Sequence, residues 1–134
     1  MNLETYLIQH KSVADEMNII KELAKKSDID AAIPEIATHI NTLAGKINMH
    51  LSMEDKYLYP HLAESEDSKI KNMAVKYQEE MGGLAKQFNE FKEKYNTKPH
   101  FLEHKATFKT DMTKVFGAIE ARVKREESEL YKHI

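Results

Sequence analysis

This chain of 134 residues contains no cysteine and no tryptophan, and it has only four glycines and three prolines. The absence of cysteine excludes disulfides, thiol catalysis, iron–sulfur clusters and zinc sites built from thiolates. It leaves the redox compartment open, because a chain without cysteine is compatible with any.

Long runs of one residue type are also missing. No apolar stretch approaches the ~20 residues of a membrane-spanning helix. The first residues, MNLETYLIQHKSVADE, are acidic and amphipathic, unlike a signal peptide. The 20 basic and 22 acidic residues nearly balance, and no run of Lys or Arg exceeds two residues. We therefore expect a cytoplasmic protein that binds neither nucleic acid nor membrane.

The sequence does contain apolar residues spaced three and four apart, the period of a helix that buries one face. Four such stripes predict helices over about residues 3–26, 31–62 and 69–95, and from residues 97–99 to the C-terminus. Asp30 is the expected N-cap of the second helix, with Pro34 in its first turn. Short connections make neighbours antiparallel, so we predict an all-α fold with one domain over residues 1–134, an up-down-up-down four-helix bundle.

The same nine-residue pattern closes both halves of the chain. Residues 54–62 read EDKYLYPHL, and residues 126–134, which lie 72 positions later, read EESELYKHI. The upstream apolar stripes align on the same offset, which indicates two related helix hairpins. The aligned pairs within the pattern are Glu54 with Glu126, Leu58 with Leu130, Tyr59 with Tyr131, and His61 with His133. The repeat also exposes a difference upstream, where His50 has Arg122 as its counterpart.

Five polar residues stand where the stripes call for apolar ones, namely His10, His50, Glu54, Arg122 and Glu126. A buried carboxylate or guanidinium costs several kcal/mol unless it is paired or bound to a metal. His50 and Glu54 project from one helix face, and the parallel fourth helix can bring Glu126 to the same height. Imidazole and carboxylate ligands suit iron, manganese or zinc rather than calcium. These residues predict a metal site of His10, His50, Glu54 and Glu126.

A metal-free interpretation fits the same residues. Arg122 would lie between Glu54 and Glu126 in a buried ion-pair cluster, with the histidines hydrogen-bonded. The bundle would then act as a protein-interaction module.

The segment from His50 to Leu62, HLSMEDKYLYPHL, resembles the second helix of the hemerythrin family in its broad cation-binding HHE form. The resemblance covers essentially the whole chain and is specific in the first half. It implies a bundle of two hairpins around a non-haem di-iron centre, each hairpin ideally supplying one His and then a His-x-x-x-Glu. His10 matches the family's first histidine, His50 and Glu54 its second-helix pair, and Glu126 its last carboxylate.

The second half departs from that family pattern. The third-helix histidine should fall near residue 81 or 82, where the sequence reads Glu80-Met81-Gly82-Gly83, and Arg122 replaces the fourth-helix histidine. A thioether is a poor ligand for iron, and an arginine stays protonated. Glu80 and Met81 are therefore expected to modify the site, and Arg122 to substitute for one of two irons.

We expect a hemerythrin-like protein with one or two iron ions, or manganese or zinc, on a reduced ligand set. The expected ligand is a small diatomic or a peroxide, and the role is sensing or handling of O2, NO, peroxide or iron. Binding or sensing is favoured over catalysis, with a di-iron peroxidase or nitric-oxide-handling enzyme as the enzymatic alternative. A ferritin-like carboxylate bundle is disfavoured, because its paired Glu-x-x-His motifs are missing.

Two further features leave alternatives open. His39 has Asp111 as its repeat counterpart, so the two residues either contact each other or His39 is a partly exposed residue at the core edge. The pair Gly82-Gly83 in mid-helix either permits close helix packing or opens the bundle beside the site.

Overall fold

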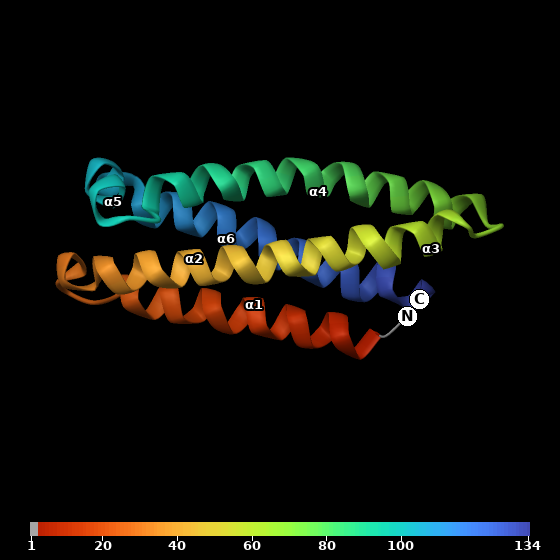
Figure 1. Ribbon diagram of the computed structural model, residues 1–134, viewed down its shortest axis with the longest axis horizontal. Helices are drawn as coiled ribbons and strands as arrows, with labels where there is room; N and C mark the ends of the chain where they lie inside the picture. The colour runs from red at the N-terminus through yellow and green to blue at the C-terminus, as the bar shows by residue number, and fades with distance from the viewer. Residues whose placement is uncertain (1–2) are drawn as a thin grey trace.

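The computed structural model describes residues 3–134, which form two antiparallel helix hairpins packed side by side (Figure 1). α1 (Leu3–Ala24) and α2 (Ile29–Met53) form the first hairpin. The rod of α2 continues through the π-helix η1 (Glu54–Leu58) and α3 (Tyr59–Ala63). α4 (Ser68–Tyr95) begins the second hairpin. The predicted all-α bundle is confirmed for the described residues.

The fourth rod is made of several short segments. It begins with α5 (Lys98–His104) and the 3-10 helix η2 (Lys105–Thr107), and continues as α6 (Phe108–Arg125). It ends with the π-helix η3 (Glu126–Leu130) and the 3-10 helix η4 (Tyr131–His133). The break was not predicted, and it arises where His104 leaves helical geometry, with φ −116° and ψ 10°. α1 begins and the chain ends at the same end of the bundle (Figure 1).

Two details of the predicted second helix are wrong. The helix begins at Ile29, so Asp28 takes the N-cap position, without a side-chain capping bond, and Asp30 lies in the first turn. The Asp30 carboxylate instead forms an ion pair with Lys105 Nζ at 2.5 Å, which links the first turn of α2 to the 3-10 helix η2. Pro34 consequently lies inside the helix rather than in its first turn.

Apolar side chains form two buried clusters along the bundle. The larger contains Phe91, Phe101 and Phe108 with the isoleucines of α2, and the smaller lies at the end that holds the chain terminus. Each fully buried side chain of this size stabilises the fold by about 1.5–3 kcal/mol. Between these clusters lie buried polar residues of the first, second and fourth rods, and they form a polar layer that divides the core: His10, His50, Glu54, Arg122 and Glu126.

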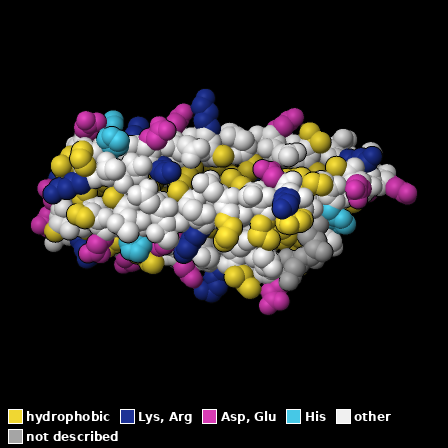
Figure 2. All heavy atoms as spheres, in the orientation of Figure 1, with side chains coloured by type: hydrophobic (Ala, Val, Ile, Leu, Met, Phe, Trp, Pro, Cys, Tyr) yellow, Lys and Arg dark blue, Asp and Glu magenta, His cyan; other side chains and the backbone are white. Residues whose placement is uncertain are grey.

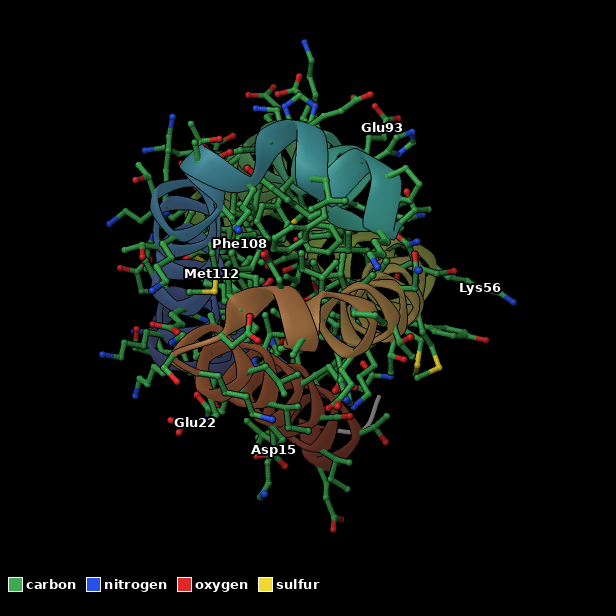
Figure 3. All side chains as sticks on the ribbon, turned by 90° about the vertical axis from the view of Figure 1, so that its left-hand side faces the viewer. Asp15, Glu22, Lys56, Glu93, Phe108 and Met112 are labelled. Atoms are coloured by element: carbon green, nitrogen blue, oxygen red, sulfur yellow. The ribbon has the colours of Figure 1, made fainter. Side chains whose placement is uncertain are left out.

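The outside of the bundle is mixed in charge. Figure 2 shows Lys, Arg, Asp and Glu scattered over one face with apolar side chains between them. Viewed along the bundle, Phe108 and Met112 point inward, whereas Lys56 and Glu93 point outward (Figure 3). None of the helices formed by residues 3–134 combines the length and apolar character that a membrane span requires.

Packing excludes one reading of each of the two features that the sequence left open. His39 Nδ1 lies 3.0 Å from Glu16 Oε2 of α1, and Asp111 accepts a hydrogen bond from Tyr95, so the contact between His39 and Asp111 is wrong. α1 covers that face of α2 and supplies the carboxylate. Close helix packing at Gly82 and Gly83 is also wrong, because no atom of another helix lies within 4 Å of a Cβ built at either residue. That the pair opens the bundle beside the site stays a prediction.

Candidate metal centre

Two π-helices position the glutamates of the polar layer. Glu54 is the first residue of η1, and its repeat counterpart Glu126 is the first residue of η3. π-helices are rare and occur mostly as single turns near functional sites. The sequence repeat is thus matched by a repeated local distortion at the candidate site, which the apolar periodicity did not predict.

Three of the four predicted ligands converge on one point. His10 Nε2 lies 3.1 Å from His50 Nε2 and 2.9 Å from Glu126 Oε1, and His50 Nε2 lies 3.7 Å from the same oxygen. All three side chains are buried. Ligand atoms that share an ion at ~2 Å are about 3 Å apart, so this spacing has the size of a coordination sphere. The group can hold a metal ion.

Glu54 completes the set of predicted ligands. Its Oε1 atom lies 3.3 Å from His50 Nε2, while Oε2 accepts a hydrogen bond from the Tyr131 hydroxyl at 2.9 Å. The Glu54 side chain is 0% exposed, and Oε1 has no hydrogen-bond partner. Burial raises the pKa of Glu54 above its ordinary value. A fully buried carboxylate oxygen that accepts no hydrogen bond and lies within ion-pair distance of the His50 ring fits a position that faces a cation.

Gln9 orients the ring of His50. His50 Nδ1 lies 2.7 Å from Gln9 Oε1, and Gln9 Nε2 donates to Met53 Sδ at 2.8 Å. If the ring is neutral, a proton on Nδ1 leaves the Nε2 lone pair facing the centre, as a metal ligand requires. Gln9 was missed from the sequence, because a lone glutamine beside a stripe histidine gives no signal of burial.

The charges around His50 favour a proton on it while no metal is bound. Burial alone would lower the pKa of His50, but hydrogen bonds and charges from Glu126 and Glu54 outweigh burial and raise the pKa to about 9. For Glu126, burial is likewise outweighed, and the hydrogen bonds from His10 and His50 with the charge of Arg122 hold its pKa well below the usual range. A cation entering the site would displace the imidazolium proton.

Arg122 fills the second half of the polar layer. Its guanidinium donates to Glu126 Oε2 at 3.2 Å, to the Tyr77 carbonyl at 2.8 Å and to the Tyr59 hydroxyl at 2.8 Å. It also lies over the Tyr77 ring, 4.6 Å from the centroid. The Glu126 carboxylate is therefore divided, with Oε1 facing the histidines and Oε2 facing the arginine.

The two predicted modifiers on α4 lie close to this arginine. Glu80 Oε2 is 3.8 Å from Arg122 and 2.9 Å from the outer Arg125. Met81 lines a cavity of about 40 Å³ together with His10, His50, Arg122 and Glu126, and the other walls are apolar. A cavity needs about 10–15 Å³ on this measure to hold one water, so there is room for a small molecule.

Tyr131 is the second residue missed from the sequence. Its hydroxyl oxygen lies 3.0 Å from His10 Nε2, 2.9 Å from Glu54 Oε2, and 3.4 Å from both His50 Nε2 and Glu126 Oε1. Burial and the charges of Glu126 and Glu54 raise its pKa, so the phenol is neutral in the metal-free protein. The sequence did contain a signal for this residue, because the repeat places a tyrosine at the equivalent position in each half, Tyr59 and Tyr131. The two tyrosines have equivalent neighbours in the repeat. The Tyr131 hydroxyl lies near His50, and the Tyr59 hydroxyl contacts Arg122, which is the repeat counterpart of His50.

Comparison with known proteins agrees with this architecture. All 134 residues match a family model described as the hemerythrin HHE cation binding domain. Searches among curated proteins and among solved structures found no match. The family match extends over residues 1–134, and His10, His50 and Glu126 gather into a group that could hold a metal ion. The chain therefore belongs to the hemerythrin family of HHE cation-binding domains.

Proposed function

We propose that this chain binds a single iron ion through His10, His50, Glu54 and Glu126, and that Arg122 takes the place of a second iron. The observation that carries the proposal is the divided carboxylate of Glu126. One oxygen lies within 2.9 Å of His10 Nε2, and the other is 3.2 Å from the guanidinium. Under this proposal, Glu126 is a carboxylate that bridges two cations, and the Arg122 guanidinium is one of these two cations.

The donor set fits one ion and not two. Two imidazole nitrogens and two carboxylate oxygens suit iron, with manganese or zinc as alternatives. The two carboxylates also balance the charge of a divalent ion. The second half offers no comparable set, because Arg122 cannot ligate and the Met81 thioether is a poor ligand for iron.

The cavity beside the site supports a role with a small ligand. Four protein ligands leave a six-coordinate ion with open positions. The walls contributed by Val13, Leu84 and Phe88 are apolar, and the volume of about 40 Å³ suits a diatomic such as O2 or NO, or a peroxide. Bound iron would supply reversible binding or redox chemistry toward such a molecule. The residues of the chain would hold the ion, exclude bulk water and limit the size of the ligand.

The iron content of the purified protein tests this proposal. The chain is loaded anaerobically with Fe(II), desalted and analysed by mass spectrometry for iron per chain. We expect one iron in the wild type and a loss of iron in His50→Ala and Glu126→Ala. His61→Ala is the matched control, since His61 is exposed and lies beyond the site. Two irons per chain in the wild type would contradict the role given to Arg122.

A metal-free bundle that acts through protein contacts is the second candidate. It is favoured by the bonds that the polar layer makes without an ion, namely Arg122 to Glu126 and Tyr131 to Glu54. In that case the wild type retains no iron after desalting, and its thermal stability is the same with iron as with chelator.

A further inference from the structure

We infer that Tyr131 is a ligand of the same iron ion in its ferric state, through its phenolate oxygen. The inference rests on the proposed function, because it assigns a fifth protein ligand to that site. The hydroxyl of Tyr131 is the one phenol oxygen that the described residues place within 3.4 Å of all four proposed ligands.

Packing holds this hydroxyl in place. The Tyr131 ring is stacked on the His10 ring, with centroids 5.2 Å apart and planes 23° apart, and it also lies against Tyr6 with a centroid distance of 5.4 Å. The side chain is 3% exposed. A phenol fixed this closely among the ligands needs only a small displacement to share their ion.

Charge explains why the ferric ion would recruit it. Glu54 and Glu126 together balance two positive charges, and Arg122 already neutralises part of Glu126. A ferric ion carries a third positive charge into a buried site, where an unbalanced charge is costly. Coordination breaks the O–H bond of Tyr131, forms an O–Fe bond and releases one proton to solvent. The phenolate then supplies the third negative charge, and hard anionic oxygen suits ferric iron.

The sequence repeat provides a matched control. Tyr59 is the repeat counterpart of Tyr131 and is also buried, but its hydroxyl accepts a hydrogen bond from Arg122 at 2.8 Å. It faces the arginine side of Glu126. Removing its hydroxyl should therefore alter the second half of the site and leave the iron ligands in place.

The experiment loads wild type, Tyr131→Phe and Tyr59→Phe with ferric citrate, then records iron content and the visible spectrum. We expect wild type and Tyr59→Phe to show a phenolate-to-iron charge-transfer band. Resonance Raman excitation in that band should enhance tyrosine ring modes. Tyr131→Phe should keep about one iron per chain and lose the band.

Two results would overturn the inference. One is a ferric wild type that holds iron but shows no such band, and the other is a band that persists in Tyr131→Phe. Both leave the proposed function intact, whereas a wild type without iron overturns both proposals. If Tyr131→Phe does not fold, the assignment is decided by the tyrosine ring modes in wild type and Tyr59→Phe, and their absence from either one refutes it.

Discussion

Truncation of Arg122 is the most informative perturbation of this fold. The Arg122→Ala change removes three hydrogen bonds, to Glu126 Oε2, the Tyr77 carbonyl and the Tyr59 hydroxyl. Arg122 is 6% exposed and Glu126 is 2% exposed, so water cannot replace the lost partner. Breaking a buried ion pair by removing one member costs about 3–5 kcal/mol. We expect a loss of that size in the free energy of unfolding of the metal-free protein.

Urea denaturation at neutral pH with chelator present measures this loss. Arg125→Ala is the matched control, because Arg125 also lies over Tyr77 and pairs with Glu80, but its side chain is 44% exposed. An exposed pair of this kind contributes about 0.2–1 kcal/mol. In iron-loaded protein the ion would balance part of the Glu126 charge, so the Arg122→Ala loss should shrink. If the two variants lose the same stability in chelator, the guanidinium is not the cation that Glu126 depends on.

Three further predictions concern the same residues. The pKa of His50 is about 9 in the folded metal-free protein, against an ordinary value of 6.5. This difference contributes roughly 3 kcal/mol to the free energy of unfolding. The contribution is fully present below pH ~6.5 and is lost as the pH rises through ~9. Urea midpoints measured across that range should fall, and a flat profile in wild type, or an equal fall in His50→Gln, would contradict this. Gln9→Leu removes the acceptor of His50 Nδ1 and should weaken iron binding about 10–100-fold, while Gln9→Glu keeps it, as competition with a chromogenic chelator would show. An unchanged affinity in Gln9→Leu would exclude this orienting role. Two double variants test the second half, one with Arg122→His and Met81→His and the other with Arg122→His and Gly82→His. At least one should take up more iron per chain than wild type, because it restores imidazoles where the second half departs from the family pattern. If both variants fold and gain no iron, the second half is not an eroded ligand set.

The fold could be predicted because its signals are local and repeated along the chain. The stripes of the second and third rods step by three and four residues over many turns. The rod from α2 through α3 therefore ends close to the predicted 31–62, and α4 close to the predicted 69–95. The break at His104 and the two π-helices were not predictable in this way. Each depends on how one turn accommodates its neighbours, and an apolar stripe passes through a π turn or a 3-10 turn with little change in pattern.

The convergence of the four predicted ligands could also be anticipated. Polar residues interrupt the apolar stripes at His10, His50, Glu54 and Glu126, and the repeat places these positions at similar levels along the bundle axis. Gln9 gave no signal, and the repetition of Tyr131 as Tyr59 did not identify the partners of Tyr131. Both are buried polar residues whose partners lie far away in sequence, such as Gln9 with His50 and Tyr131 with His10. The direction of the Arg122 side chain was equally hidden, since sequence alone did not decide whether it pairs with Glu54 or Glu126.

One metal ion between the histidines, with an arginine in the second position, would be visible in crystals of the iron-loaded protein. The decisive measurement is an anomalous difference map at the iron absorption edge. We expect one peak per chain, about 2 Å from His10 Nε2, His50 Nε2 and Glu126 Oε1, with the Arg122 guanidinium still paired to Glu126 Oε2. Two peaks flanking Glu126, or no peak among these side chains, would contradict it.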